Sequence, residues 1–353
     1  MVTVKGYFAA MADHDNGSGR PKVLFICGTI NQTTQMHKIY RELPEVDSYF
    51  TPYYGDHLID WARRRNLLEF SILGNKIGHR SLQYLVRHGL KIDQHGRRNS
   101  YDLVVTCADL IIPKNIRHLP IILVQEGMTD PEGFWYHAVK YIPGVPRWLA
   151  STAAMGLSGA YDRFCVASPG YRDLFIRKGI DREKIVVTGI PNFDDCDRFR
   201  NNTFPHRGFA LLCTSDSRET FQWENRRRTI ERALEIAGHR KLIVKLHPNE
   251  RVEYATAEIR RYAPQALVFA EGNTEEMIAN CDVLITRFSS TVYVGLALGK
   301  EVYSSFDIDE LRRLMPIQGG SASMNIARVC RDILLGTGRV PAGEYVQDRV
   351  ATV

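Results

Sequence analysis

The sequence predicts an α/β protein built from two doubly wound domains, each with helices on both faces of a parallel sheet. Short uninterrupted apolar runs recur along the chain, and such runs are typical of parallel strands that are buried on both faces. Most of these runs are followed by a polar turn and a helical pattern, which is the alternation of βα units. With 353 residues, 44% of them hydrophobic and 24% charged, the chain is long enough for two globular domains with their own cores.

The first domain is expected at residues 21–195, after a flexible leader at 1–20. Its strands are predicted from the apolar runs, and one helix is predicted from the Ser-Pro-Gly turn that precedes it. The strands are expected at 22–27, 103–106, 121–124, 163–167 and 184–188, and this helix at 171–178.

A polar run at 196–208, rich in Asp, Arg and Asn, is predicted to link the two domains. The second domain is expected at 209–310, where strand and helix patterns alternate again. Its strands are predicted at 209–213, 242–246, 266–269, 283–286 and 301–304, and its helices at 224–237, 252–262 and 274–280. The remaining segment, 311–353, begins with a helical pattern and is expected to pack back on the first domain.

Composition narrows the class of partner. The net charge of +6 comes without a long Lys/Arg tract, which suits an anionic ligand or a membrane surface better than nucleic acid. The seven cysteines are scattered and form no CxxC pair, so we expect reduced, buried thiols. The sequence has no apolar run long enough to cross a bilayer, and we expect a cytoplasmic protein that can associate peripherally with the inner face of a membrane.

Candidate phosphate ligands follow two strands of the second domain, at 242–246 and 283–286, which we expect to be neighbours in the sheet. Nucleotides bind beyond the carboxyl ends of such strands, where imidazole, hydroxyl and backbone N–H groups can neutralise phosphate charge. The candidates are Lys245, His247 and Pro248 after the first strand, and Ser289, Ser290 and Thr291 after the second. Taken separately, His247-Pro248 is also a strand-ending turn and the Ser-Ser pair is also a helix N-cap.

A candidate catalytic carboxylate follows the strand at 121–124. Gly127 permits a sharp turn there, so Glu126 can be held at the carboxyl end of the sheet as a base, although Asp130 in the same loop is an alternative. An N-cap or a salt-bridge partner is the other interpretation of Glu126.

Two further loops can line the same region. After the first strand the chain breaks at Gly28, and a polar loop at 29–35 leads into a helix at 36–43. This loop contributes Thr29 and Asn31, and Gly189 contributes from the turn after the strand at 184–188.

The pattern of the whole chain resembles the GT-B glycosyltransferase fold, two Rossmann-like domains facing a cleft, in the superfamily that includes the non-hydrolysing UDP-N-acetylglucosamine 2-epimerases. The segment at 280–302 is similar to the donor-binding unit of that fold, whose Leu-Gly-Lys-Pro turn here ends in Glu301. Bacterial transferases of capsule and lipopolysaccharide assembly are closer still: the sialyltransferase-like, Kdo transferase-like and glycerophosphotransferase-like families share an HP motif and an SS motif. His247-Pro248 and Ser289-Ser290 match them.

Departures from these families limit what the resemblance implies. Gln125-Glu126-Gly127 is similar to an acidic (D/E)(D/E)G motif, with Gln in the first position. The stretch at 291–295 lacks the acid that holds ribose in many GT-B enzymes. In the epimerases a Thr-x-His segment supplies a working histidine, whereas here Thr214 is followed by Asp216 in place of that histidine.

The resemblance implies a glycosyltransferase that needs no metal or other cofactor. A nucleotide-activated sugar, CMP-linked or UDP-linked, would bind the second domain, and a glycan or lipid-linked acceptor would bind the first. Two alternatives remain open: a UDP-N-acetylglucosamine 2-epimerase-like epimerase or hydrolase, and a catalytically silent nucleotide-binding subunit. The stereochemical outcome, inverting or retaining, is also open.

The first domain has a basic and aromatic character. An Arg run at 63–65 follows Trp61, and further aromatic residues cluster later in the domain, namely Trp135, Tyr136, Tyr141 and Trp148. A lipid-linked acceptor at an anionic bilayer would suit this character. A solvated helix face with ordinary core aromatics is the alternative interpretation.

Overall fold

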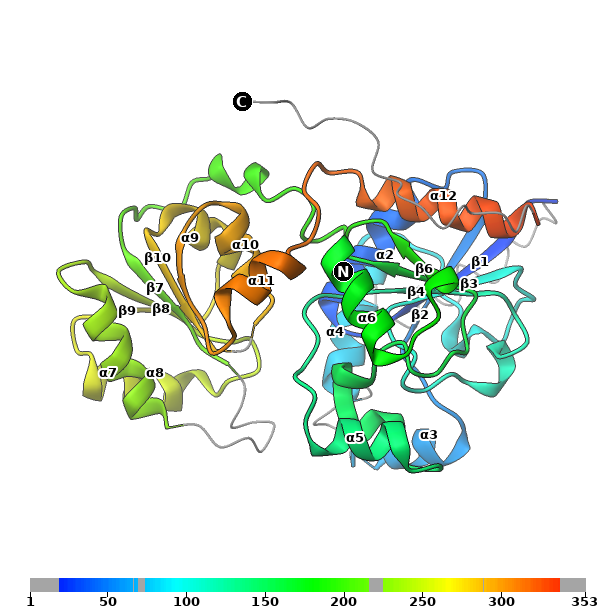
Figure 1. Cartoon of the computed structure of the whole chain (residues 1–353), viewed down its shortest axis with the longest axis horizontal. Coiled ribbons are helices and arrows are strands. Elements are labelled where there is room, and N and C mark those ends of the chain that lie inside the picture. Colours follow the sequence, from blue (N-terminus) through cyan, green and yellow to red (C-terminus); the bar gives the residue numbers. More distant parts are fainter. Residues whose placement is uncertain (1–18, 66, 69–73, 216–224, 288, 337–353) are drawn as a thin grey trace. The chain divides into compact units, whose positions relative to one another are not determined.

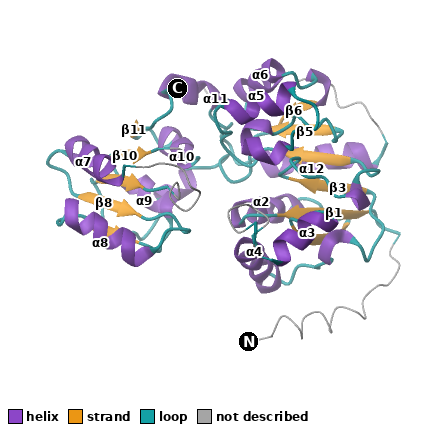
Figure 2. Ribbon diagram, turned by 90° about the horizontal axis from the view of Figure 1, so that it is seen from below, coloured by secondary structure: helices purple, strands orange, loops and turns teal. Residues whose placement is uncertain are grey.

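The chain divides into two compact units. The computed structural model describes residues 19–65, 67–68, 74–215, 225–287 and 289–336. Unit 1 comprises Met1–Asp194 together with Gly319–Val353, and unit 2 comprises Asp195–Gln318. Each unit is an α/β layer structure with helices on both faces of a parallel sheet (Figures 1 and 2).

The sheet of unit 1 has six parallel strands in the order β2-β1-β3-β4-β5-β6. These strands are β1 Lys22–Cys27, β2 Asp47–Pro52, β3 Leu103–Thr106, β4 Ile121–Val124, β5 Arg163–Val166 and β6 Ile185–Val187. The helices are α2 Ile30–Arg41, α3 His57–Arg64, α4 Asn75–Arg87, α5 Phe134–Tyr141, α6 Pro169–Lys178 and α12 Ala322–Leu334, with 3₁₀ turns η1 Gln94–Gly96, η2 Lys114–Ile116, η3 Arg147–Ala154 and η4 Arg182–Lys184. The predicted strands at 103–106 and 121–124 are confirmed with these bounds.

Unit 1 differs from the sequence-based expectations in two places. The polar stretch at 29–35 is not a loop, because α2 already begins at Ile30. Thr29 caps it in a reciprocal capping box, in which its hydroxyl accepts from the backbone N–H of Gln32 and the Gln32 side chain accepts from that of Thr29. The edge strand β2 was also missed, because its sequence, DSYFTP, is largely polar and ends in proline.

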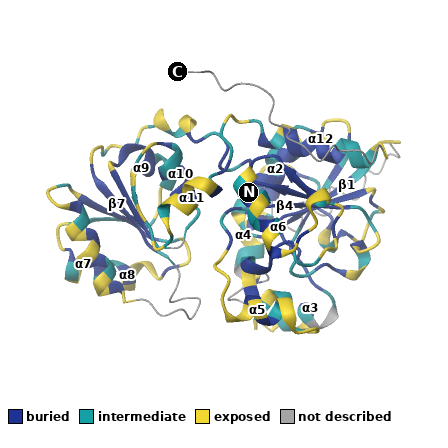
Figure 3. Ribbon diagram, in the orientation of Figure 1, coloured by how far each residue is buried: buried dark blue, intermediate teal, exposed yellow. Residues whose placement is uncertain are grey.

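The C-terminal helix α12 completes the core of unit 1. Ile326, Val329 and Cys330 are fully buried in one apolar cluster with residues of β1, α2 and β3, and Figure 1 shows α12 beside α2. Arg331 fixes the far end of the helix by an ion pair with Glu45, at 2.6 Å. Most strands of both units are buried, the edge strands β9 and β11 of unit 2 excepted, and exposed residues lie on the outer faces of the helices (Figure 3).

The sheet of unit 2 has five parallel strands in the order β11-β10-β7-β8-β9. These strands are β7 Ala210–Cys213, β8 Leu242–Lys245, β9 Leu267–Phe269, β10 Val283–Thr286 and β11 Glu301–Tyr303. The helices are α7 Arg226–Ala237, α8 Val252–Tyr262, α9 Thr274–Asn280, α10 Thr291–Ala297 and α11 Ile308–Leu314, and η5 spans Asp197–Arg200. The predicted strand at 283–286 and helices at 252–262 and 274–280 are confirmed with these bounds.

Two predictions for unit 2 require correction. β8 and β10 are not neighbours, because β7 lies between them: the chain builds β8 and β9 on one side of β7 and then crosses to build β10 and β11 on the other. The segment 196–208 belongs to unit 2 instead of acting as a free linker. The side-chain amides of Asn202 and Asn280 exchange hydrogen bonds at 2.8 and 3.1 Å. Arg207 also donates to the side-chain oxygen of Asn280, at 2.9 Å.

All seven cysteines are buried and unbridged, as predicted. Desolvation raises the pKa of Cys27 and Cys165 to about 12, which keeps these thiols protonated. The cysteines therefore act as small apolar core residues.

The packing of α12 predicts how a core truncation will behave. Ile326→Ala should lower the free energy of unfolding by about 2–5 kcal/mol, because it leaves a cavity among fully buried neighbours. Met324→Ala on the exposed side of the same helix should change it by less than about 0.5 kcal/mol. Urea denaturation followed by circular dichroism measures both, and equal losses in the two variants would contradict the packing described.

Candidate functional site

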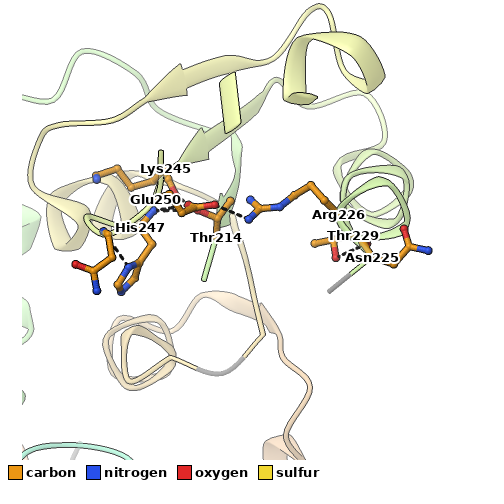
Figure 4. Close-up of polar contacts among 8 residues, drawn as sticks. Thr214, Asn225, Arg226, Thr229, Lys245, His247 and Glu250 are labelled. Atoms are coloured by element: carbon orange, nitrogen blue, oxygen red, sulfur yellow. Dashed lines mark hydrogen bonds and ion pairs between the residues drawn. The ribbon is translucent and has the colours of Figure 1, made fainter. Parts of the chain in front are cut away.

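The turn after β8 is held by a buried ion pair. Glu250 pairs with Arg226 at the start of α7, and both side chains are 2% exposed. The second carboxylate oxygen of Glu250 accepts from the hydroxyl of Thr214, at the end of β7, and from the backbone N–H of His247, at 2.8 Å. Figure 4 shows these groups together. The His247-Pro248 turn is therefore fixed to both β7 and α7.

This arrangement defines how His247 can interact. Its Nδ1 accepts from the backbone N–H of Asn249 at 3.3 Å, so in the neutral imidazole the proton lies on Nε2. The residue is partly exposed at the carboxyl end of the sheet. His247 is thus oriented to present an N–H donor beyond the strand ends.

Lys245 does not share this orientation. Its ammonium group donates to the backbone carbonyls of Leu246, at 2.9 Å, and Ala270, at 3.0 Å. Only 5% of the residue is exposed, and desolvation lowers the pKa of its ammonium group. Lys245 ties the end of β8 to the segment after β9.

The Ser289-Ser290-Thr291 segment follows β10 at the same end of the sheet. Ser289 Oγ accepts from the backbone N–H of Thr291 at 3.3 Å and from its hydroxyl at 2.9 Å, and Ser290 is the N-cap residue of α10. Because β7 separates β8 from β10, this segment and the His247 turn leave the sheet two strand spacings apart, roughly 10 Å. Their hydroxyl and imidazole groups therefore lie along one end of one sheet.

A pocket of about 490 Å³ opens at this end of the sheet, where the strand order reverses between β7 and β10. Such switch points are where ligands bind in open α/β sheets. Its described lining carries three arginines, Arg228, Arg232 and Arg287, and no acidic residue. Polar contributions come from Thr214, Ser215, Asn225, Thr229, Ser304 and Ser305. The pocket suits an anion, and Thr214 connects it to the His247 turn.

In unit 1, Glu126 is held at the carboxyl end of β4 by three neutral donors from the start of α2. Its Oε1 accepts from the Thr29 hydroxyl at 2.8 Å and from the Asn31 amide at 3.2 Å, and its Oε2 accepts from the Gln32 amide at 2.6 Å. Asn31 is held in turn by Asn192, which donates to its side-chain oxygen at 2.6 Å. The structure thus brings together Glu126, Thr29 and Asn31, and adds Gln32 and Asn192.

The residues around Glu126 have structural roles. Gln125 is fully buried, donates to the Gly127 carbonyl at 2.7 Å and accepts from the Ala167 N–H at 2.9 Å. Gly28 packs so closely on Gln32 that an added Cβ would lie 2.0 Å from its side-chain oxygen.

The other predicted residues make contacts of their own or lie outside the described residues. Asp130 accepts from the hydroxyl of Thr152 at 2.8 Å, which ties its loop to η3. Gly189 has φ of +83° in the turn after β6 and donates to the Val166 carbonyl. Asp216 lies outside the described residues.

Sequence reasoning missed Glu250, Arg226, Gln32 and Asn192. A glutamine three residues after Thr29 matches the capping-box pattern and could have indicated Gln32. Arg226 carries no such local signal, because its partner is distant in sequence. Within the described residues no three His, Cys, Asp or Glu side chains gather as a metal site would require. No described helix combines the length and apolarity needed to cross a bilayer.

Comparison with known proteins identifies the fold. No protein-family profile and no curated sequence matches the chain. Among solved structures, a UDP-GlcNAc 2-epimerase from Neisseria meningitidis bound to UDP-GlcNAc is 13% identical, with a TM-score of 0.52 over 88% of this chain and 91% of that chain. A variant of the wall teichoic acid polymerase TagF soaked with CDPG is 12% identical, with a TM-score of 0.51 over 94% of this chain and 93% of that one.

The chain has a GT-B-like fold. At these identities the likeness establishes the fold alone, one shared by nucleotide-sugar enzymes of more than one type.

The buried pair predicts a specific loss of stability in unit 2. Glu250→Gln keeps the shape and the acceptor oxygen but leaves Arg226 as an uncompensated buried charge, which should lower the free energy of unfolding by about 3–5 kcal/mol. Glu253→Gln in the exposed first turn of α8 is the matched control and should change it by less than about 0.5 kcal/mol. Thermal and urea denaturation measure the difference, and a wild-type transition for Glu250→Gln would show that the pair does not hold the turn.

Proposed function

We propose that the protein is a glycosyltransferase that moves a sugar from a nucleotide-activated donor to a hydroxyl group of an acceptor, with unit 2 binding the donor and unit 1 the acceptor. One observation carries the proposal: the Arg226–Glu250–Thr214 network holds an imidazole N–H donor at the carboxyl end of a sheet, beside a pocket rich in arginine and hydroxyl groups. Hydrogen-bond donors and cations of this kind stabilise the negative charge that develops on a nucleotide phosphate as it leaves.

The phosphate charge of the donor would be met by side chains. His247 donates from Nε2, Ser289 and Ser290 donate from their hydroxyls, and Arg287 adds positive charge from the pocket. Hydrogen bonds from neutral or charged donors to an anion strengthen in a site with few waters. In this proposal these groups neutralise the leaving phosphate without a metal ion.

Glu126 is the proposed base. It takes the proton of the acceptor hydroxyl while the acceptor oxygen bonds to the anomeric carbon of the sugar. The bond from that carbon to the phosphate oxygen breaks, and its electron pair leaves with the nucleotide. Thr29, Asn31 and Gln32 orient the carboxylate and carry no charge, so its negative charge is not cancelled by a fixed cation among these three donors.

We also rank the candidate donors by their nucleotide. CMP-linked and UDP-linked donors come first, and cytidine diphosphate donors join them because TagF, with the same fold, was solved after soaking with CDPG. The epimerases share the fold as well, so acceptor-independent conversion of UDP-GlcNAc is the second candidate function. Asp216, in place of the working histidine of those enzymes, disfavours it.

The decisive experiment incubates the protein with CMP-, UDP-, GDP- and CDP-activated donors, with and without glycan or lipid-linked acceptors. Nucleotide release that depends on acceptor supports the proposal. Conversion of the donor without acceptor indicates an epimerase or hydrolase, and donor binding without any turnover indicates a silent nucleotide-binding subunit.

Once a donor is known, two sets of variants separate binding from chemistry. Glu126→Gln should lower kcat by about 10²–10⁴-fold with little change in donor affinity, because it removes only the base. His247→Ala and Ser289→Ala/Ser290→Ala should weaken donor binding by about tenfold or more, since each loses hydrogen bonds to phosphate. His239→Ala, an exposed histidine of the same unit, is the control. Wild-type kcat in Glu126→Gln would remove this residue from the chemistry.

We also propose that a surface on α5 and η3 docks on an anionic membrane. Large apolar side chains are exposed here, with Phe134 at 78%, Tyr141 at 69% and Ile142 at 56% exposure (Figure 3, α5). Trp135 and Trp148 add half-exposed indoles. The sequence between these two residues contains Lys140 and Arg147 but no acidic residue. Interfacial aromatic residues flanked by cations match the headgroup region of an anionic bilayer.

Vesicle binding tests this surface. The wild-type protein should sediment with vesicles containing phosphatidylglycerol and less with pure phosphatidylcholine. Trp135→Ser/Tyr141→Ser should reduce binding to the anionic vesicles by about tenfold or more, because two large apolar side chains no longer insert. Tyr254→Ser, which removes a 66% exposed tyrosine from unit 2, is the control. Equal sedimentation of both variants would contradict the proposal.

A further inference from the structure

A second pocket, of about 240 Å³, lies at the carboxyl end of the edge strand β2 in unit 1. It is formed by the end of β2, the last turn of α3, the first turns of α4 and the turn η1. The described residues that line it are Pro52, Tyr53, Arg63, Gly74, Asn75, Gly78, His79, Leu82, Gln94 and His95. The functions proposed above make no use of this pocket.

The described lining of this pocket contains basic side chains and no acidic ones. Arg63, His79 and His95 face the pocket, and no acidic residue is among its described lining. The 13-residue helix α4 begins here, and its N-cap residue, Gly74, makes no side-chain cap, so backbone N–H groups of the first turn are directed to this region. Cations, imidazoles and a helix N-terminus together suit an oxyanion.

Among the described residues, Arg63 forms only a long ion pair, with Asp60. Its Nε lies 3.6 Å from Asp60 Oδ1, beyond hydrogen-bond distance, and both atoms are buried without a hydrogen-bond partner in the described part of the chain. Asp60 Oδ2 lies 3.8 Å from His95 Nδ1. Asp60 thus lies beside the Arg63 guanidinium and the His95 imidazole without forming a hydrogen-bonded, bidentate pair with Arg63, so the other guanidinium N–H groups can bind a ligand.

His95 is held in a strained conformation. Its φ of +64° lies in the left-handed region, which only one other non-glycine residue in the described chain adopts. The Thr51 hydroxyl accepts from its backbone N–H at 2.9 Å, Asn115 donates to its carbonyl at 3.1 Å, and its ring stacks on Tyr54 with centroids 5.3 Å apart. Strain that the surroundings enforce in this way is concentrated at functional sites.

The pocket adjoins the Glu126 cluster. β2 pairs directly with β1, whose carboxyl end carries Gly28. A Cβ at Gly28 would lie 3.5 Å from Tyr53, which lines the pocket, and 2.0 Å from Gln32, which holds Glu126. In the sheet order β2-β1-β3-β4, about three strand spacings, roughly 15 Å, separate the strand that carries the pocket from the strand that carries Glu126. Gly28 and Gln32, after the end of β1, connect the two.

We propose that this pocket binds an oxyanion of the acceptor, a phosphate or a carboxylate, and so places the acceptor hydroxyl near Glu126. This inference rests on the proposed function in assigning the anion to the acceptor. The binding site itself rests only on the residues that line the pocket.

The site can be tested without turnover, by NMR of the full chain with ¹³C-labelled histidine. Inorganic phosphate and glycerol 3-phosphate are titrated in, and His79→Gln and His95→Asn assign the two signals. Asn tolerates a positive φ, so His95→Asn should remain folded. We expect the His79 and His95 signals to shift with one shared Kd, distinct from any shift of His247 in the donor site.

Arg63→Gln should weaken this binding at least tenfold, whereas Arg65→Gln, whose exposed guanidinium stacks on Trp61 at 4.7 Å, should leave it unchanged. Glu126→Gln should bind like the wild type. Unshifted His79 and His95 signals in the wild type, or equal Kd values in Arg63→Gln and Arg65→Gln, would overturn the site.

The source of the anion is decided by competition and kinetics. If the acceptor supplies it, Arg63→Gln should raise KM for an anionic acceptor tenfold or more and leave KM for the donor unchanged, and inorganic phosphate should compete with that acceptor. Binding of phosphate without such competition would overturn the assignment to the acceptor. If no donor is turned over, the proposed function fails, yet the titration still decides whether the oxyanion site exists.

Discussion

The buried ion pair between Arg226 and Glu250 is the constraint on which the carboxyl end of the unit 2 sheet depends. Burying two charges is unfavourable unless each is paired and hydrogen-bonded, and Glu250 meets that condition with Arg226, the Thr214 hydroxyl and the His247 N–H. An apolar cluster could stabilise the same fold. Such a cluster could not fix the direction of the His247 backbone relative to β7 and α7. The backbone direction in turn sets the position of the His247 ring.

The two site carboxylates differ in what surrounds them, and this separates their roles. Glu250 is 7% exposed and its charge is cancelled by an arginine, so it is committed to structure. Glu126 is partly exposed and is held by the neutral donors of Thr29, Asn31 and Gln32. A carboxylate that is oriented without a fixed cation among its donors keeps its charge for a ligand, which is why Glu126 is the candidate for proton transfer.

The sequence predicted what depends on local pattern. Apolar runs located β3, β4 and β10 to the residue, because strands buried on both faces of a parallel sheet need continuous apolar sequence. Strand order was not accessible: nothing near β8 or β10 indicates that β7 lies between them, since this is set by where the chain crosses over. The polar start of α2 and the partner of Glu250 were missed for a related reason, because a cap or a buried pair is recognised only when both partners are considered together.

The glutamine in the first position of the acidic motif has a physical explanation in the structure. Gln125 is fully buried, donates to the Gly127 carbonyl and accepts from the Ala167 N–H, so it joins the turn after β4 to β5. A carboxylate there could accept but not donate, and it would place an unpaired charge in the core. The amide therefore holds the backbone on both sides of residue 126. With that turn fixed, the direction of the Glu126 carboxylate is set before any ligand binds.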